Sequence, residues 1–322
     1  MDLSIRAIET SKDEIKQPKL VEDPMYIPPL GSSVIISGKS GSGKSTLLAN
    51  LITDDRFYKG WFDKIFVFSP TANGDDVQKA LGVPANNVFT DLDEAPQVLD
   101  LILDTQQTKL DKAAGAHKVP QYCIIFDDVI GNTQFLNDKA FMRCFYQVRH
   151  VNCTTFVCTQ HFKRVPRVCR LQANFIFFFQ GSQSEVEMMA EEFAPPIMSK
   201  REFMHMVTTV TAEPFSFLTI NMKVHWGTRF RKNLNKMIVL RGSSKLYGSD
   251  AKEENAGRIK DEKTGGSGEP SPGESGTRTD GGRGGEVRRN RNRAREDPRA
   301  FCVEGKRSST KPNFFHKARN KT

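Results

Sequence analysis

The clearest chemistry in the sequence lies in one stretch of nine residues, Gly38-Lys39-Ser40-Gly41-Ser42-Gly43-Lys44-Ser45-Thr46. It matches the phosphate-loop pattern G-x-x-x-x-G-K-[ST] without a mismatch. Because glycines lack Cβ atoms, such a backbone can wrap a phosphate chain and point its N–H groups inward. Lys44 is then expected to reach the β- and γ-phosphates, and the Ser45 hydroxyl to ligate Mg²⁺. The alternative is a Gly/Ser-rich surface turn that meets the pattern by chance.

A pair of carboxylates, Asp127 and Asp128, follows the apolar run 122–126. If that run is a buried strand, both carboxylates emerge at the carboxyl edge of the sheet, beside the phosphate loop. Asp127 is expected to hold Mg²⁺ through its water shell, and Asp128 to orient or deprotonate an attacking water. Burying two adjacent carboxylates requires compensating cations or hydrogen bonds, which favours a functional role. The alternative is that the pair caps the next helical segment.

Two further elements follow the acidic pair. Gln160 ends the next strand-like run, where its amide can contact the γ-phosphate or the attacking water; with Thr159 it can equally cap a strand. In the basic segment 161–170, an arginine inserted into a neighbouring subunit's site would neutralise transition-state charge, worth ~10³–10⁵ in rate. The alternatives are a solvated basic turn or a loop that contacts nucleic-acid phosphates.

One motif points elsewhere. Residues 128–131 read D-x-x-G, as in GTP-binding switches. Those proteins also carry an N-K-x-D motif that reads guanine, and residues 235–238 lack its aspartate. The sequence therefore disfavours a GTPase.

The elements that must position these residues alternate along the chain. Apolar runs predict strands over residues 33–37, 64–69, 87–90, 121–126, 154–160, 174–180 and 215–222. Helical spacing predicts helices over residues 45–52, 95–110, 137–150, 182–193 and 199–211, with Ser182 and Glu185 forming a capping box. This alternation predicts an α/β fold with a mostly parallel central sheet and helices on both faces.

Charge and composition divide the chain. Of its 47 basic residues, 20 lie after residue 240 together with 12 of the 38 acidic ones, so the excess of +9 belongs almost wholly to residues 241–322. That segment is rich in Gly, Ser and Pro and shows no apolar period, which is typical of disorder. The predicted organisation is an N-terminal arm (1–30), a body (31–240) and a disordered basic tail (241–322).

The six cysteines show no C-x-x-C pair and no histidine at zinc-site spacing, which favours free thiols in a reducing compartment. The first 19 residues have no apolar core, so no secretory signal is expected. No run approaches the ~20 apolar residues of a membrane helix. A soluble, intracellular protein is expected.

Together these residues resemble the genome-packaging ATPases of large DNA viruses, namely the poxvirus-type enzymes and their relatives in virophages and Polinton elements, within the HerA/FtsK superfamily of P-loop NTPases. The resemblance covers roughly residues 30–240. It is carried by the loop 38–46, the Ile-Ile-Phe-Asp-Asp run that ends at Asp128, Arg149-His150, Thr159-Gln160 and the segment 166–170.

The resemblance implies a sheet with an additional strand between those that carry Gly38 and Asp127. It also implies rings that couple ATP hydrolysis to threading double-stranded DNA into a preformed capsid. Lys44 and Ser45 would bind phosphate and Mg²⁺, Asp127 Mg²⁺, Asp128 the water, and Gln160 would act as sensor. Asp128 departs from the glutamate of many superfamily members. Arg170 is the first choice for the arginine that acts in trans, and Arg167 the second.

The implied cofactors are ATP and Mg²⁺, and the implied partners are double-stranded DNA, a capsid or portal-like protein, and further copies of the chain in a ring. The expected location is an infected host cell, in the nucleus or a cytoplasmic viral factory, with association to the virion left open. The tail can supply non-specific affinity for DNA or serve as a nuclear-localisation or solubilising segment.

Two other functions remain as alternatives. A small-molecule phosphotransferase such as a nucleoside kinase usually carries an arginine-rich lid, which the basic segment 161–170 can imitate. A nucleotide-gated scaffold would recruit DNA or capsid protein through the tail without work from hydrolysis.

Overall fold

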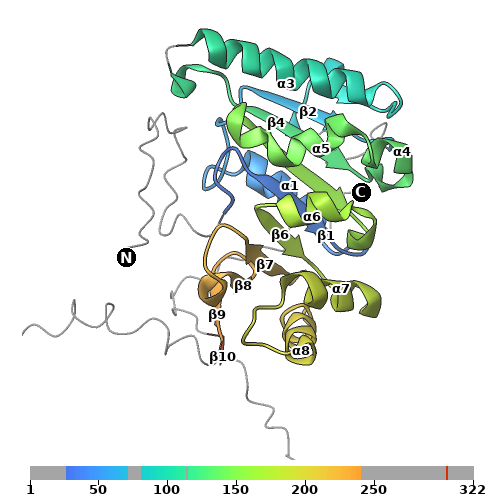
Figure 1. The fold of residues 1–322 in the computed structure, drawn as a ribbon, viewed down its shortest axis with the longest axis vertical. Helices are drawn as coiled ribbons and strands as arrows, with labels where there is room; N and C mark the ends of the chain where they lie inside the picture. The colour runs from blue at the N-terminus through green and yellow to red at the C-terminus, as the bar shows by residue number, and fades with distance from the viewer. Residues whose placement is uncertain (1–26, 72–80, 114, 241–301, 304–322) are drawn as a thin grey trace, which may run out of the picture. The chain divides into compact units, whose positions relative to one another are not determined.

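The computed structural model describes residues 27–71, 81–113, 115–240 and 302–303, and these residues contain one sheet of ten strands (Figure 1). The strand order is β10-β9-β8-β7-β6-β1-β5-β4-β2-β3. The strands are β1 (Ser33–Ser37), β2 (Lys64–Phe68), β3 (Val88–Phe89), β4 (Tyr122–Asp127), β5 (Cys153–Thr159), β6 (Phe175–Phe178), β7 (Leu218–Asn221), β8 (Phe230–Lys232), β9 (Lys236–Val239) and β10 (Cys302–Val303).

The six strands from β6 to β3 in this order pair in parallel, and the four from β7 to β10 extend the sheet in antiparallel pairs. The predicted, mostly parallel α/β sheet is confirmed for the part that carries the phosphate loop. β5 lies between β1 and β4, so an additional strand separates the strand before Gly38 from the strand that ends at Asp127. This arrangement was implied by the family resemblance.

Helices cover both faces of the sheet (Figure 1). Alternation along β1 shows the two cores: Ile35 joins one, whereas Val34 and Ile36 join the other. The second core takes buried residues from α1, and the first core takes them from α3 to α8. The helices are α1 (Lys44–Thr53), α3 (Ala95–Lys112), α4 (Thr133–Leu136), α5 (Lys139–Tyr146), α6 (Arg167–Gln172), α7 (Gln183–Phe193) and α8 (Lys200–Val210).

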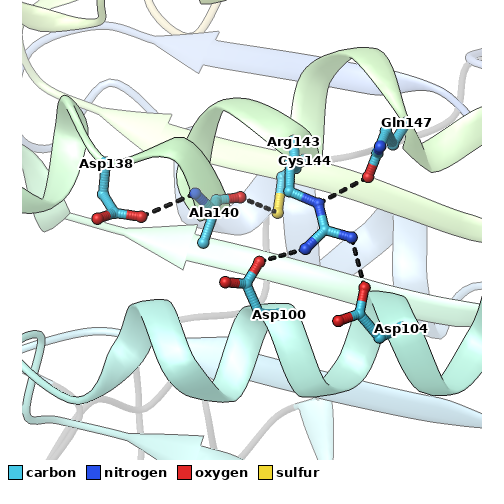
Figure 2. A network of polar contacts seen from close by, with 7 residues as sticks. All are labelled: Asp100, Asp104, Asp138, Ala140, Arg143, Cys144 and Gln147. Atoms are coloured by element: carbon cyan, nitrogen blue, oxygen red, sulfur yellow. Dashed lines mark hydrogen bonds and ion pairs between the residues drawn. The ribbon is translucent and has the colours of Figure 1, made fainter.

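An ion-pair network joins two helices on the first face (Figure 2). Arg143 of α5 bonds the carboxylates of Asp100 and Asp104, one turn apart on α3, and its Nε donates to Gln147. On the same helix, the ring of Phe141 packs against that of Phe126 of β4, with 5.0 Å between the ring centroids. Phe126 directly precedes Asp127, so the packing of α5 supports the end of β4 where the carboxylates emerge.

The structure differs from the sequence prediction at two helical segments. The predicted helix 137–150 is broken: Asp138 accepts from the Ala140 N–H and starts α5, which ends at Tyr146 before a 3₁₀ turn at Val148–His150. The basic segment 161–170 is not simply a loop, because it contains a 3₁₀ turn and the start of α6. Pro166 immediately precedes α6, where its fixed φ suits a helix start.

The C-terminal strands were missed. β8 and β9 are short, lack clean alternation, and turn at Asn233, whose φ of 54° is left-handed. Two residues of the predicted tail form β10, with Cys302 paired to Val239 and Val303 to Ile238.

The structure describes only parts of the predicted N-terminal arm and of the predicted tail. Ile27 and Leu30, at the end of the predicted arm, are buried, and the Tyr58 hydroxyl donates to the Pro28 carbonyl. Residues 1–26 and the rest of the predicted tail lie outside the described residues, so their predicted structure stays a prediction. Chain contacts define two units, 1–240 with 301–322 and 241–300, and the second lies wholly outside the described residues. Within the described part, no helix combines the length and apolarity needed to cross a bilayer.

Candidate nucleotide-binding site

The predicted phosphate loop runs from the end of β1 to the start of α1. Gly41 and Gly43 have φ of 74° and 98°, in the left-handed region that glycine adopts without strain. Lys39, Ser40 and Gly41 are exposed at the loop's tip. The predicted strand–loop–helix context of the motif is therefore present.

Close contacts leave no room for a side chain at Gly38 and little room for one at Gly43. A Cβ at Gly38 would lie 2.5 Å from the Phe179 Cβ and 2.8 Å from the Ser42 Oγ. A Cβ at Gly43 would lie 3.3 Å from a ring carbon of Phe215. Phe179 and Phe215 thus pack against the loop, a role that no pattern in the sequence predicts.

Lys44 begins α1 with its side chain buried, and its Nζ donates to the Lys39 carbonyl at 2.9 Å. Burial lowers the pKa of Lys44, while the charges of Cys158, Asp127 and Asp128 act to raise that pKa. The ammonium group thus lies within electrostatic range of both aspartates, as a phosphate-neutralising lysine must. The Ser42 Oγ is also buried and has no hydrogen-bond partner, which a bound phosphate oxygen could supply.

The acidic pair lies where the sequence placed it. Asp127 ends β4 in register with Cys158 of β5, and the Asp128 N–H donates to the Cys158 carbonyl at 3.2 Å. Asp128 has a φ of 53°, which is costly for a residue with a Cβ and is commonest at functional sites and turns. It precedes a 3₁₀ turn, yet its side chain makes no capping bond, so the capping alternative gains no support.

Gln160 directly follows β5, and its Nε2 donates to the Asp128 Oδ2 at 3.4 Å. Thr159 takes the capping role instead, since its Oγ1 accepts from the His161 N–H at 3.0 Å. Phe162, two residues after Gln160, is anchored by a residue far away in the sequence: its N–H donates to the buried Glu185 carboxylate at 2.9 Å. Glu185 therefore both caps α7, as predicted, and anchors the segment after Gln160.

The two candidate arginines lie in contrasting surroundings. The Arg170 side chain is 6% exposed, and it donates to the Glu192 carboxylate through Nε at 2.9 Å and Nη2 at 2.6 Å. Its Nη1 donates to the carbonyls of Val165 and Lys163. The Arg167 side chain is 72% exposed and approaches Glu192 only at 3.5 Å. This geometry disfavours Arg170 as the arginine that acts in trans. No pattern in the sequence marks Glu192 as the residue that pairs with Arg170.

The Arg149-His150 pair lies away from the site. Both side chains are exposed before the start of β5, and the Arg149 Nε bonds the His150 Nε2 at 2.9 Å. Gln160 follows the opposite end of the same strand, so the pair is not brought to the phosphate loop.

The donor chemistry fits Mg²⁺. Among the described residues, no three His, Cys, Asp or Glu side chains gather as a metal cluster. The Ser45 hydroxyl on the first turn of α1 and the Asp127 carboxylate are hard oxygen donors, which suit Mg²⁺ when phosphate oxygens complete its shell. When bound, the ion would neutralise charge on the phosphates; Ser45 and Asp127 would hold it.

A glycine-rich loop between a central parallel strand and a helix, with aspartates at the end of a nearby strand, defines a P-loop NTPase domain. Its sheet is of the additional-strand type. The Poxvirus A32 protein family matches residues 30–222, and the chain belongs to that family. The predicted relationship to the poxvirus-type enzymes is thereby confirmed.

Similar proteins include one viral relative found by sequence and two viral proteins of known structure. "Uncharacterized protein 015R" of Frog virus 3 (isolate Goorha) is 27% identical over 150 residues, which are 47% of this chain and 44% of that protein. The match thus spans less than half of that relative. The DNA-packaging ATPase B204 from Sulfolobus turreted icosahedral virus is 13% identical, with a TM-score of 0.45 over 63% of this chain and 97% of B204. B204 from Sulfolobus turreted icosahedral virus 2 in complex with ATP-gammaS is 14% identical, with a TM-score of 0.43 over 63% and 97%.

Proposed function

We propose that this protein is an ATP-hydrolysing motor that moves double-stranded DNA to package a viral or virus-like genome. The observation that carries the ATPase assignment is the contact of Gln160 with Asp128, beside Lys44 and the phosphate loop. Membership in the Poxvirus A32 protein family supports it.

Each side chain has a role in this proposal. Backbone N–H groups of the loop and Lys44 hold the phosphates of ATP, while Ser45 and Asp127 hold Mg²⁺. Asp128 orients the attacking water and accepts its proton, and Gln160 fixes that carboxylate and reports on the γ-phosphate. The 3.4 Å amide–carboxylate distance allows Gln160 to move from Asp128 to a phosphate oxygen with little loss.

The arginine in trans is assigned to Arg167 rather than Arg170. Arg167 is exposed at the start of α6, and the same short helix carries the exposed apolar side chains of Val168 and Leu171, a composition suited to contact with a second copy of the chain. The test mixes a small amount of Arg167→Ala protein with an excess of Lys44→Ala protein. Each Arg167→Ala subunit keeps its own Lys44, and its neighbour supplies an intact Arg167 in trans. Its ATPase activity should therefore equal that of wild-type protein diluted into the same excess of Lys44→Ala protein. Alone, Arg167→Ala should lose most turnover, whereas a rate unchanged from wild type would remove the assignment.

The test of the ATPase assignment is the release of inorganic phosphate by wild type, Asp128→Asn and Gln160→Ala. We expect Asp128→Asn to abolish turnover and Gln160→Ala to lower it by about 10²-fold, as expected for loss of a group that acts in the transition state. Arg149→Ala, away from the loop, is the matched control. Full turnover in Asp128→Asn would refute the assignment of the base. Transfer of phosphate onto a nucleoside instead of water would indicate the kinase alternative.

The DNA assignment needs a separate test, because the basic excess lies after residue 240. Replacing residues 241–300 with a Gly/Ser linker of equal length removes only part of that excess, so the variant also replaces the six basic residues after Val303 with serine: Lys306, Arg307, Lys311, Lys317, Arg319 and Lys321. It retains Cys302–Val303 for β10. Retained stimulation of the ATPase by double-stranded DNA would support a motor whose body acts on DNA. Loss of all DNA binding with unchanged ATPase activity would favour the scaffold.

A further inference from the structure

Glu185 is a buried carboxylate whose two oxygens serve different segments of the chain. Its Oε2 accepts from the Ser182 N–H at 3.0 Å and from the Ser182 hydroxyl at 3.3 Å, which closes the capping box of α7. Its Oε1 accepts from the Phe162 N–H at 2.9 Å, 23 positions earlier in the chain. Two backbone N–H groups and a hydroxyl therefore hold this buried carboxylate.

The capping box of α8 shows what capping alone requires. There Glu202 pairs with Ser199 in the same motif. The Glu202 Oε2 accepts from the Ser199 N–H at 2.8 Å and from the Ser199 hydroxyl at 2.7 Å, and the residue is exposed. One exposed oxygen is thus enough to close a capping box. Capping accounts for the Oε2 of Glu185 but not for its burial or for the bond that its Oε1 makes.

The segment that this second oxygen holds carries Gln160. Before Gln160, the Thr159 carbonyl accepts from the first N–H of the phosphate loop at 3.1 Å. After it, the Thr159 Oγ1 bonds the His161 N–H at 3.0 Å and the His161 carbonyl at 3.2 Å. Glu185 then holds the N–H of Phe162, the next residue. Hydrogen bonds therefore fix the backbone on both sides of Gln160.

The Phe162 side chain makes this anchor rigid. Its ring is fully buried and meets the rings of Phe178 of β6 and Phe193 of α7 at 5.9 and 6.1 Å between centroids. The Arg170 guanidinium lies over the same ring, with its Cζ 5.6 Å from the centroid. Of the contacts that hold Phe162, the bond to Glu185 acts directly on the backbone that leads to Gln160.

We propose that Glu185 is a positioning residue for hydrolysis, which holds Gln160 in the direction that its amide needs to reach Asp128 and the γ-phosphate. This inference rests on the proposed role of Gln160 and adds the residue that fixes its position. The amide nitrogen lies 3.4 Å from the Asp128 Oδ2, at the long end of the hydrogen-bond range, so that contact holds the side chain only weakly. The backbone must then set its direction, and a displacement of about 1 Å at a catalytic group can lower a rate by about 10²-fold.

The test compares the two capping boxes. Glu185→Ala and Glu202→Ala both remove the glutamate of a capping box, but only Glu185→Ala also releases the Phe162 N–H. The kcat for phosphate release should fall by about tenfold in Glu185→Ala, with a KM for ATP within about twofold of wild type, because the phosphate loop is unchanged. Glu202→Ala, the matched control, should keep the wild-type kcat.

A double variant separates positioning from a general loss of structure. If Glu185 acts through Gln160, Gln160→Ala/Glu185→Ala should hydrolyse ATP at the same rate as Gln160→Ala alone. Losses that multiply in the double variant, or a wild-type kcat in Glu185→Ala, would overturn the inference. Weaker binding of a non-hydrolysable ATP analogue by Glu185→Ala than by Glu202→Ala would assign Glu185 to the fold and also overturn it. A full rate in Gln160→Ala would instead refute the proposed role of Gln160 itself.

Discussion

Arg170 provides a sharp test because two roles for it predict opposite phenotypes. If it holds α6 to α7 through Glu192, its loss destabilises each protomer. If it acts in a neighbouring site, its loss abolishes hydrolysis in a protomer of normal stability. The side chains of Arg170 and Glu192 are 6% and 8% exposed, so solvent screens this pair little.

The expected magnitude follows from that burial. Replacing Arg170 with alanine leaves the Glu192 carboxylate buried without its main partner, which costs about 3–5 kcal/mol. For a body of this size, each kcal/mol lowers the melting temperature by about 2–4 °C, so Arg170→Ala should melt about 6–20 °C below wild type. Arg167→Ala loses one exposed contact to Glu192 at 3.5 Å, worth under about 1 kcal/mol.

Thermal unfolding by circular dichroism of the nucleotide-free protein measures both variants. The double variant Arg170→Met/Glu192→Met removes both charges and should recover most of the lost stability. Recovery should be incomplete, because the Val165 and Lys163 carbonyls lose their donor. An Arg170→Ala protein that melts like wild type but hydrolyses no ATP would refute this reasoning and restore Arg170 as the arginine in trans.

Three more predictions follow from the site and the cores. Lys44→Met removes a buried cation and should stabilise the nucleotide-free protein at pH 7. Burial lowers the pKa of Lys44 in the folded protein, so between that lowered pKa and the unfolded value near 10.5 the unfolded chain binds more protons than the folded one. The gain in stability from Lys44→Met should therefore shrink in melts at pH 10. A constant gain would exclude Lys44 titration as its cause. Gly38→Ala should lower the free energy of unfolding by about 1–3 kcal/mol and remove most of the nucleotide affinity, because the new Cβ would collide with Phe179. Gly41→Ala has open space but a φ of 74°, so it should lower the free energy of unfolding by only about 1–2 kcal/mol. Equal nucleotide affinities of the two variants would contradict this packing argument. A thiol reagent should label no more than one of the six cysteines in the folded protein, because the five described cysteines are buried. Burial raises the thiol pKa of four of them: Cys123, Cys144, Cys153 and Cys169. Fast labelling of two or more cysteines would contradict their burial.

The sequence predicted the parts of the fold that depend on local pattern. Continuous apolar runs located the parallel strands, and the motif with its flanking strand and helix located the phosphate loop. Asp127, Asp128 and Gln160 could be placed together because carboxyl ends of parallel strands share one edge of the sheet. The contact between Gln160 and Asp128 follows directly from that shared edge.

The remainder depends on contacts between distant segments, which one sequence does not reveal. Glu192 lies 22 positions from Arg170, and no local pattern marks it as the partner that removes this arginine from the surface. Phe215 looked like the first residue of a strand, whereas the hairpin 230–239 fixes it in a turn beside Gly43. β8, β9 and β10 are short strands whose pairing is set by tertiary context more than by residue preference.

The central claim is that hydrolysis at this phosphate loop is coupled to double-stranded DNA. The most direct measurement is the steady-state rate of ATP hydrolysis by the full chain with and without double-stranded DNA, alongside Lys44→Ala. The account predicts a rate that rises severalfold with DNA and vanishes in Lys44→Ala under both conditions. Turnover at the full rate without DNA, unchanged when DNA is added, would contradict it.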